Sequence, residues 1–418
     1  MSEPTPDDPP VLAAPADGTP PIIATVPALA RAIDELAHAR GPLGVDTERA
    51  QSYRYSAKAY LLQLRRAGAG TSLIDPVAFE QGGATADLSS QAAALQDAEW
   101  IIHAASQDLP CLAEIGFLPR RLFDTELAGR LLGLPRVALG TMIETAFGVR
   151  LLKEHSAADW SRRPIPDEWL DYAALDVELL AELRDWLAER LVDAGKLDWA
   201  MQEFDHLART AGQTPVPRAD PWRRTNGIHH VRSQRGMAVV REVWLARDKI
   251  ARENDRAPGR ILADRSICEL AALADESRSA PRRRLLGRAD LRQIEGFRRR
   301  HSARYENTWL QALQRAQELS RPDLPPRTLP VDGPPPVRSW ESRAPEAYAR
   351  WSRLRAASLK IAAENTVPVE NLIAPDLVRR LAWEPPDATP LSDRMAGLGA
   401  RPWQIGLLGG DFEAAVAG

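Results

Sequence analysis

The chain has 418 residues, of which 44% are hydrophobic and 27% are charged, values that fit ordinary globular domains. At about 150 residues per domain, this length predicts two to three domains. The two cysteines exclude a disulfide framework and a cysteine-rich zinc module. The sequence lacks an apolar run long enough for a membrane span and the features of a signal peptide, so we expect a cytoplasmic protein with no membrane partner.

The charges are distributed unevenly along the chain. The segment from Arg218 to Arg321 contains 24 Lys and Arg against 13 Asp and Glu, a local charge of +11. The remaining residues carry 30 bases and 44 acids, a charge of −14, which the overall value of −3 conceals. A basic middle segment is typical of a module that binds a polyanion, although solvated arginine-rich helices would give the same pattern.

Proline-rich segments divide the chain into domains. Proline lacks a backbone donor and resists helix formation, so such segments are typical of tails and semi-rigid linkers. We predict a disordered tail over residues 1–21 and linkers over residues 213–228 and 321–340. Three domains are expected between them, over residues 22–212, 229–320 and 341–416.

The first of these domains alternates strand and helix patterns. Strands are expected over residues 43–48, 60–64, 72–76, 100–104 and 122–124. Helices are expected over residues 88–95 and from Asp167 to Leu187, where apolar residues recur at helical spacing. A hairpin followed by strand–helix units predicts an α/β fold with a mixed sheet flanked by helices. The two C-terminal segments show only helical periodicity and predict two small all-α bundles.

Three groups of residues are candidates for chemistry. Asp46 and Glu48 lie two apart on a strand, so their carboxylates point to one face, where they suit Mg²⁺ or Mn²⁺. Asp108 follows a strand at a position that fits a metal ligand or a helix N-cap. Tyr172 and Asp176 are four apart on a helix and lie side by side. Each group alone also has a structural interpretation, as an exposed acidic pair, a cap, or a tyrosine bonded to an aspartate.

The order and surroundings of these residues resemble the ribonuclease D family of DEDDy 3′→5′ exonucleases. The resemblance covers residues 22–210 and rests on the segments 44–48, 73–76, 103–109, 123–128, 159–164 and 172–177. The basic segment at about 230–320 is similar to the HRDC module, and residues 341–415 resemble a more diverged copy of it.

This resemblance implies a ribonuclease-H-like exonuclease domain followed by two HRDC-like helical bundles. It implies that two divalent metal ions, Mg²⁺ or Mn²⁺, are held by Asp46, Glu48, Asp108 and Asp176, and that Tyr172 positions the attacking water. Two metal ions suit this chemistry because they can hold the attacking and the leaving oxygen of an in-line displacement. The family's activity implies a monomeric enzyme that releases 5′-mononucleotides from the 3′ ends of tRNA precursors and other small structured RNAs.

Other residues are weaker candidates for contact with RNA. Lys153 and Arg163 could contact phosphate, or they could pair on the surface with Asp159 and Glu168. Gln63 lies on the strand next to that of Asp46 and could meet the terminal nucleotide, although packing is the favoured interpretation. His103 leads the segment before Asp108 and is expected to be a buried strand histidine with a local partner. The HRDC-like module contains two arginine runs that are expected to bind the phosphates of an RNA backbone. They consist of Arg282, Arg283 and Arg284, and of Arg298, Arg299 and Arg300.

Two other functions remain open at this point. A DNA-directed 3′→5′ exonuclease would use the same carboxylates, because such a site does not read the 2′-hydroxyl. A non-catalytic nucleic-acid-binding protein would use only the helical modules, and the complete set of five site residues argues against it. A phosphate-binding G-x-x-x-x-G-K-[ST] string, which a helicase would carry, is absent from the sequence.

Overall fold

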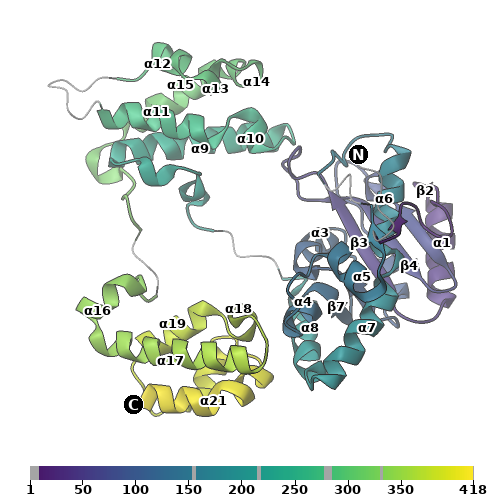
Figure 1. The fold of residues 1–418 in the computed structure, drawn as a ribbon. Coiled ribbons are helices and arrows are strands. Elements are labelled where there is room, and N and C mark those ends of the chain that lie inside the picture. Colours follow the sequence, from purple (N-terminus) through teal and green to yellow (C-terminus); the bar gives the residue numbers. More distant parts are fainter. Residues whose placement is uncertain (1–8, 153–156, 214–217, 277–284, 330–332, 418) are drawn as a thin grey trace. The chain divides into compact units, whose positions relative to one another are not determined.

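The computed structural model describes residues 9–152, 157–213, 218–276, 285–329 and 333–417 (Figure 1). The chain forms two compact units. The first contains the residues up to 49, 58–213 and those from 331 on, and it holds a sheet with its helices and the C-terminal helices. The second contains residues 50–57 and 214–330 and is helical. Within the described residues, no helix is both long enough and apolar enough to cross a membrane.

A six-stranded mixed sheet organises the first unit. Its order is β2 (Ile22–Ile23), β5 (Gly70–Ile74), β4 (Ala59–Arg66), β3 (Leu43–Arg49), β6 (Trp100–Ile102) and β7 (Leu122–Asp124). β3, β4 and β5 form an antiparallel meander, whereas β6 and β7 continue from β3 in parallel, and β2 pairs in parallel with β5. The predicted mixed sheet is therefore confirmed.

Helices cover this sheet and connect its parallel strands, as such crossovers require. They are α1 (Val26–His38), α2 (Ser89–Ala94), α3 (Leu109–Glu114), α4 (Thr125–Leu131), α5 (Leu139–Phe147), α6 (Asp167–Glu178), α7 (Leu180–Asp193) and α8 (Leu197–Thr210). Their buried faces join the apolar side chains of the strands in one core, which includes Leu43, Val45, Trp100 and Phe123.

The helix that we expected from Asp167 to Leu187 is broken at Leu179 into α6 and α7. Gly44 of β3 lies against this break. A Cβ atom added to Gly44 would lie 3.5 Å from the Val177 carbonyl oxygen and from Leu180 Cβ, an ordinary van der Waals distance, so the helix break packs closely on the strand. α6 packs over β3, β4 and β5, whereas α7 packs mainly on α4. One apolar stripe thus covers two surfaces, which periodicity alone does not reveal.

The N-terminal segment is more ordered than we expected. Val11–Leu12 form β1, which pairs in parallel with β8 (Arg150–Leu151). The Ala16 N–H donates to Glu178 Oε1 at 3.2 Å, and the Thr19 hydroxyl donates to Asp171, so the segment is bonded to α6. These contacts explain why the prediction of disorder from proline and acid content differs from the structure over residues 9–21. The preceding eight residues lie outside the described part of the chain.

The C-terminal helices of the first unit pack on α8. They are α16 (Trp340–Arg343), α17 (Pro345–Glu364), α18 (Val369–Leu372), α19 (Pro375–Trp383), α20 (Leu391–Gly397) and α21 (Pro402–Ala417). Arg401 Nε donates to Glu203 Oε1 at 2.9 Å, and the Trp403 indole donates to the same oxygen at 2.8 Å. Trp403 also stacks on Trp199 with ring centroids 4.8 Å apart. A buried carboxylate and an aromatic stack therefore anchor these helices to the nuclease part of the unit.

The second unit is a helical bundle. Its helices are α9 (Gln234–Glu253), α10 (Pro258–Ile261), α11 (Asp264–Glu276), α12 (Arg288–Gln293), α13 (Glu295–Arg298), α14 (Arg300–Ala303) and α15 (Glu306–Glu318). They enclose a core that includes Trp222 and Trp309. The loop of residues 50–57, which joins β3 to β4, belongs to this unit, and the Tyr55 hydroxyl donates to Asp248 of α9 at 3.0 Å.

The helices α9–α11 and α17–α19 follow the same plan. Each set begins with a 20-residue helix and continues through a four-residue helix. Asn254 and Asn365 follow the two long helices, and their Nδ2 atoms donate to a carbonyl four residues earlier at 2.7 and 2.9 Å. The next residues, Asp255 and Thr366, both have positive φ, at 40° and 51°. This likeness supports two diverged copies of one module, although the predicted domain boundaries stay predictions.

Candidate active site

Three carboxylates from two elements converge on one face of the sheet. Asp46 and Glu48 project from β3 and Asp176 projects from α6, with ligand oxygens that lie within 4.8 Å of one another. The first two share this face because strand residues two apart point the same way. Carboxylate oxygens are the ligands that Mg²⁺ and Mn²⁺ prefer, so the donor set and its spacing fit a divalent cation.

Asp108 lies beside this cluster and is held by two residues of β3. Thr47 Oγ1 donates to Asp108 Oδ1 at 2.7 Å, and Arg49 Nη2 lies 3.6 Å from the same oxygen. Asp108 is not one of the three carboxylates within 4.8 Å, but its charge contributes to the raised pKa of Asp46. The fourth predicted ligand is therefore adjacent to the cluster and hydrogen-bonded to the strand that carries two of the others.

Asp124, which we did not predict as a site residue, fixes the loop that leads to Asp108. Its carboxylate accepts from the N–H groups of Ala104 and Ala105 at 3.1 and 2.9 Å, and also from two N–H groups in the first turn of α4. Ala104 has a left-handed φ of 58°, so the turn depends on these bonds. Asp124 lies in the family-like segment 123–128, which is the sequence signal that could have identified it.

Burial and mutual repulsion raise the pKa values of the carboxyl groups. The pKa values of Asp46 and Glu48 lie well above their ordinary values, chiefly because desolvation disfavours their charged forms and then because of the neighbouring carboxylates. Burial raises the pKa of Asp108 to about 6, against the opposing effects of Thr47 and Arg49. A bound cation favours the ionised forms and would reverse these shifts. Carboxylates that are costly to ionise in the absence of a cation are typical of a metal site.

Tyr172 lies one turn before Asp176 on α6, and its hydroxyl hydrogen-bonds to the Asp176 carboxylate. Burial raises the pKa of the Tyr172 phenol far above its ordinary value, and the charges of Asp176, Glu48 and Asp46 add to this. Its ring lies near Trp160, with centroids 6.4 Å apart. The hydroxyl therefore keeps its proton and can donate to an oxygen at the edge of the cluster.

Arg163 fixes the segment that precedes α6 through hydrogen bonds of its guanidinium. Its guanidinium donates to both carboxylate oxygens of Asp75 at 2.7 Å, and to the carbonyl oxygens of Tyr60 and Trp160 at 2.8 Å. All three of its nitrogens thus donate within the protein. Arg163 therefore has an ion-pair partner, but this partner is Asp75, 88 residues away in the chain, in place of the expected Asp159 or Glu168.

The other weaker candidates have different surroundings. His103 is half-buried and lies just after β6, not on a strand as expected, and its Nδ1 lies 2.9 Å from Thr125 Oγ1, 22 residues away in the chain. Gln63 of β4 is fully buried and offers no surface to a nucleotide. Lys153 lies outside the described residues, as do Arg282, Arg283 and Arg284.

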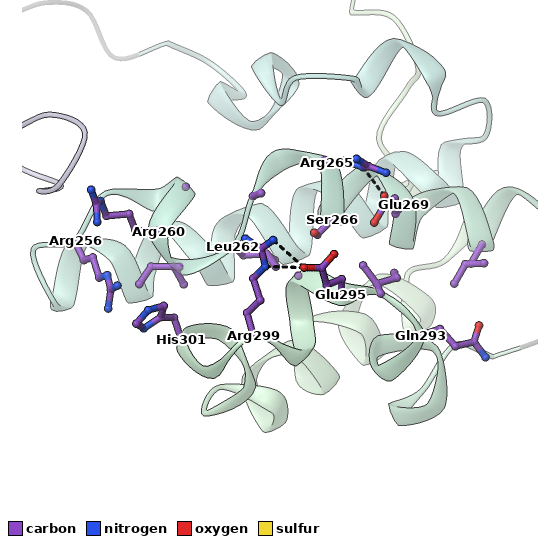
Figure 2. Close-up of a pocket in the computed structure, with 16 residues that line it drawn as sticks. Arg256, Arg260, Leu262, Arg265, Ser266, Glu269, Gln293, Glu295, Arg299 and His301 are labelled. Carbon is purple, nitrogen blue, oxygen red and sulfur yellow. Dashed lines mark hydrogen bonds and ion pairs between the residues drawn. The ribbon is translucent and has the colours of Figure 1, made fainter. Parts of the chain in front are cut away.

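The second unit contains a basic cavity of about 770 Å³ lined by residues of α10, α11, α13 and α14 (Figure 2). Its basic lining residues are Arg256, Arg260, Arg265, Arg299 and His301. Arg265 pairs with Glu269 at 2.7 Å and Arg299 pairs with Glu295 at 2.8 Å, as the dashed lines in Figure 2 show. Arg298, Arg299 and Arg300 of the predicted RNA-binding run are all exposed, which is compatible with contact to a phosphate backbone.

Family models match three parts of the chain. Residues 20–192 match a model described as 3′-5′ exonuclease, and residues 237–313 match the HRDC domain. Residues 333–415 match a model described as 3′ to 5′ exonuclease C-terminal domain, in the region where we predicted a second HRDC-like bundle over residues 341–416.

Curated relatives are similar over much of the chain. Ribonuclease D of Granulibacter bethesdensis is 30% identical over 81% of this chain and 80% of its own length. Ribonuclease D of Gluconacetobacter diazotrophicus is 29% identical over 84% of this chain and 83% of its own length. The match to ribonuclease D of Acidiphilium cryptum is 33% identical over 61% of this chain and spans 64% of that protein.

Two solved structures are similar in fold along almost the whole chain. A protein from Bifidobacterium adolescentis is 36% identical, with a TM-score of 0.84 over 98% of this chain and 100% of that one. RNase D of Escherichia coli superposes with a TM-score of 0.65 over 95% of this chain and 98% of its own, at 22% identity. Both likenesses agree with an α/β domain followed by helical modules.

Proposed function

The chain belongs to the ribonuclease D family, and we therefore propose that it is a metal-dependent 3′→5′ exoribonuclease. The observation that carries this proposal is the convergence of Asp46, Glu48 and Asp176 within 4.8 Å. Tyr172 is hydrogen-bonded to the last of these carboxylates. The enzyme hydrolyses phosphodiesters one at a time from the 3′ end of RNA and releases 5′-mononucleotides.

The carboxylate cluster is the metal site of this proposal. Asp46, Glu48, Asp108 and Asp176 would hold two divalent cations, Mg²⁺ or Mn²⁺. When bound, such ions neutralise the charge that develops on the phosphate oxygens and lower the pKa of water. The chain's own contribution is to hold the carboxylates in place, and Thr47 does this for Asp108 through its hydroxyl.

Tyr172 has a positioning role in the reaction. Its hydroxyl is protonated and lies against the cluster, so it can donate a hydrogen bond and orient the attacking water. Because Asp176 is its present acceptor, the same helix turn holds a metal ligand and the group that orients the nucleophile.

The second unit supplies affinity for RNA in this proposal. Its exposed arginines and its basic cavity give it the electrostatics of a module that tracks a phosphate backbone. The E. coli relative is described as an exoribonuclease involved in structured RNA processing. We extend this to tRNA precursors and other small structured RNAs as substrates of this chain, which we take to act as a monomer in the cytoplasm.

End-labelled substrates test the proposal directly. The purified full chain is incubated with 3′- or 5′-labelled RNA and with DNA of the same sequence, in Mg²⁺, in Mn²⁺ and in EDTA. We expect stepwise shortening of RNA from the 3′ end, release of 5′-mononucleotides and no reaction in EDTA. Faster shortening of DNA would favour a DNA-directed exonuclease, and binding without cleavage would favour a non-catalytic protein.

A further inference from the structure

Gln63 lies in the middle of β4 with its side chain fully buried. Among the described residues, neither its Oε1 nor its Nε2 has a hydrogen-bond partner. An amide that leaves water without gaining a partner destabilises the fold, so a purely structural position of this kind favours an apolar residue. Its neighbours Leu62 and Leu64 on the same strand are such residues. Gln63 therefore calls for an explanation other than packing.

Gln63 lies on the face of the sheet that carries the carboxylate cluster. It is directly opposite Asp46 in the antiparallel ladder, and opposed residues project to the same side with Cβ atoms about 4.5–5.5 Å apart. This face is covered by α6, which brings Asp176 to the cluster. Arg65, two residues along β4 on the same face, donates to Glu178 of α6 at 3.2 Å. The Gln63 amide is thus enclosed between the strand of Asp46 and the helix of Asp176.

We propose that Gln63 is a positioning residue of the metal site, and that its Nε2 donates a hydrogen bond to the Asp46 carboxylate when a divalent cation is bound. This inference rests on the proposed function, because it takes the cluster to be a metal site. Hydrogen bonds from outer partners orient the ligands of a metal and are needed for full affinity. A neutral amide provides such a donor without adding negative charge to an already acidic cluster.

Two features separate this role from the alternatives. A contact with the terminal nucleotide would need exposed surface, and the Gln63 side chain has none. A structural hydrogen bond would be formed without any cation, and none joins Gln63 to another described residue. A role that begins when a bound cation orients the carboxylates accounts for both observations.

Substitution to methionine tests the proposal with readouts that do not depend on catalysis. Gln63→Met keeps the length of the side chain and removes both polar atoms. We expect the metal-free full chain to unfold at the same temperature as the wild type or a higher one, because an unpartnered amide is lost. We also expect its Mn²⁺ affinity, measured by calorimetric titration, to fall about 10–100-fold. If methionine is not accommodated, Gln63→Asn, whose amide is one methylene short of Asp46, should show the same loss of affinity.

Leu62→Met is the matched control, because Leu62 is equally buried on β4 but points to the opposite face. It should leave Mn²⁺ affinity unchanged. Wild-type Mn²⁺ affinity in a folded Gln63→Met variant would overturn the proposal. If Gln63→Met loses metal-free stability, Gln63→Asn decides the question, and wild-type Mn²⁺ affinity in that variant would overturn the proposal. Asp46→Asn separates this failure from that of the proposed function. If Asp46→Asn also retains wild-type Mn²⁺ affinity, the cluster itself is not the metal site.

Discussion

The hydroxyl of Thr47 donates a 2.7 Å hydrogen bond to Oδ1 of Asp108, a residue 61 positions later in the chain. Both groups are buried, and this bond ties the loop after β6 to the strand that carries Asp46 and Glu48. Three consecutive residues of β3 therefore serve one site. Asp46 and Glu48 contribute carboxylates, and Thr47 between them holds the Asp108 carboxylate through a hydrogen bond.

Replacing Thr47 by valine should leave the Asp108 carboxylate less firmly positioned, because its hydrogen-bond donor is lost. Thr47→Val keeps the branched shape and removes the donor, so the pKa of Asp108 should rise further, because the hydroxyl lowers it. We expect the free energy of unfolding to fall by about 1–2 kcal/mol, and RNA hydrolysis to slow by about 10–100-fold. Urea unfolding and kinetics of nucleotide release measure the two effects. As a control, Thr145→Val removes an exposed hydroxyl on α5 and should change neither the stability nor the kinetics. Wild-type kinetics in Thr47→Val would show that the hydrogen bond from Thr47 to Asp108 is not needed for hydrolysis.

The raised pKa values predict how the metal-free protein responds to pH. A carboxyl group with a higher pKa in the folded chain than in the unfolded chain binds more protons when folded, and this stabilises the fold at low pH. The stabilisation is complete below the unfolded pKa of about 4, and for Asp108 it is lost as pH rises through about 6. Urea unfolding in EDTA at several pH values should show this loss, and Mg²⁺ should offset it at neutral pH.

A variant provides the control for this pH dependence. Asp46→Asn combined with Asp108→Asn removes two of the groups with raised pKa values, so stability should fall less between acidic and neutral pH than in the wild type. Parallel curves for the two proteins would mean that these carboxyl groups titrate normally.

The hydroxyl of Tyr172 should matter for turnover and not for metal binding. Tyr172→Phe keeps the ring beside Trp160 and removes the donor at the edge of the cluster. We expect a loss of about 10²–10³-fold in kcat on a short RNA, with unchanged Mn²⁺ affinity by calorimetry. Tyr348→Phe on α17, whose ring stacks on Trp351, should behave like the wild type. Normal turnover in Tyr172→Phe would make Tyr172 a packing residue.

The exposed arginines of the second unit should affect substrate affinity and not the chemical step. Combining Arg298→Gln with Arg300→Gln should weaken binding of a tRNA precursor and reduce the log–log salt slope by about 0.7 for each phosphate that the variant no longer neutralises. The kcat on a short oligomer should be unchanged. Arg209→Gln on α8 is the control, since it removes an equally exposed charge from the first unit. Equal salt slopes in the double variant and the wild type would mean that these arginines are only solvated.

Charge substitutions test this role better than truncation does. Removing everything after residue 213 would also remove α21, and would leave the buried Glu203 without Arg401 and without the Trp403 indole. Breaking a buried ion pair in this way costs about 3–5 kcal/mol. Weak RNA binding by such a fragment would then report loss of stability as well as loss of the basic module.

Local patterns in the sequence predict the mixed sheet and show which candidate residues share a face, whereas the assignment of these residues as metal ligands comes from the resemblance to ribonuclease D. The alternation of a strand places Asp46 and Glu48 on one face, and the helical spacing of Tyr172 and Asp176 places them side by side. Each of these relationships involves residues within one element, which is why spacing alone reveals it.

Relationships between elements could not be predicted in the same way. The Thr47–Asp108 bond, the Asp75–Arg163 pair and the helix break against Gly44 all depend on which elements the topology brings together. The order of residues 9–21 likewise depends on hydrogen bonds to α6 and β8 that composition does not indicate. The hairpin pattern places Gln63 next to the strand of Asp46, but only the folded chain shows that its amide has no partner among the described residues.

Substitution of Asp46 is the decisive test of whether the carboxylate cluster carries out hydrolysis at the RNA 3′ end, because Asp46→Asn replaces a ligand by an amide of the same size. The variant should fold and bind RNA, but its release of 5′-mononucleotides in Mg²⁺ or Mn²⁺ should fall by about three orders of magnitude. Asp34→Asn, at an exposed position on α1, should retain wild-type turnover. Wild-type release of mononucleotides by a well-folded Asp46→Asn variant would contradict the assignment of this cluster as the active site.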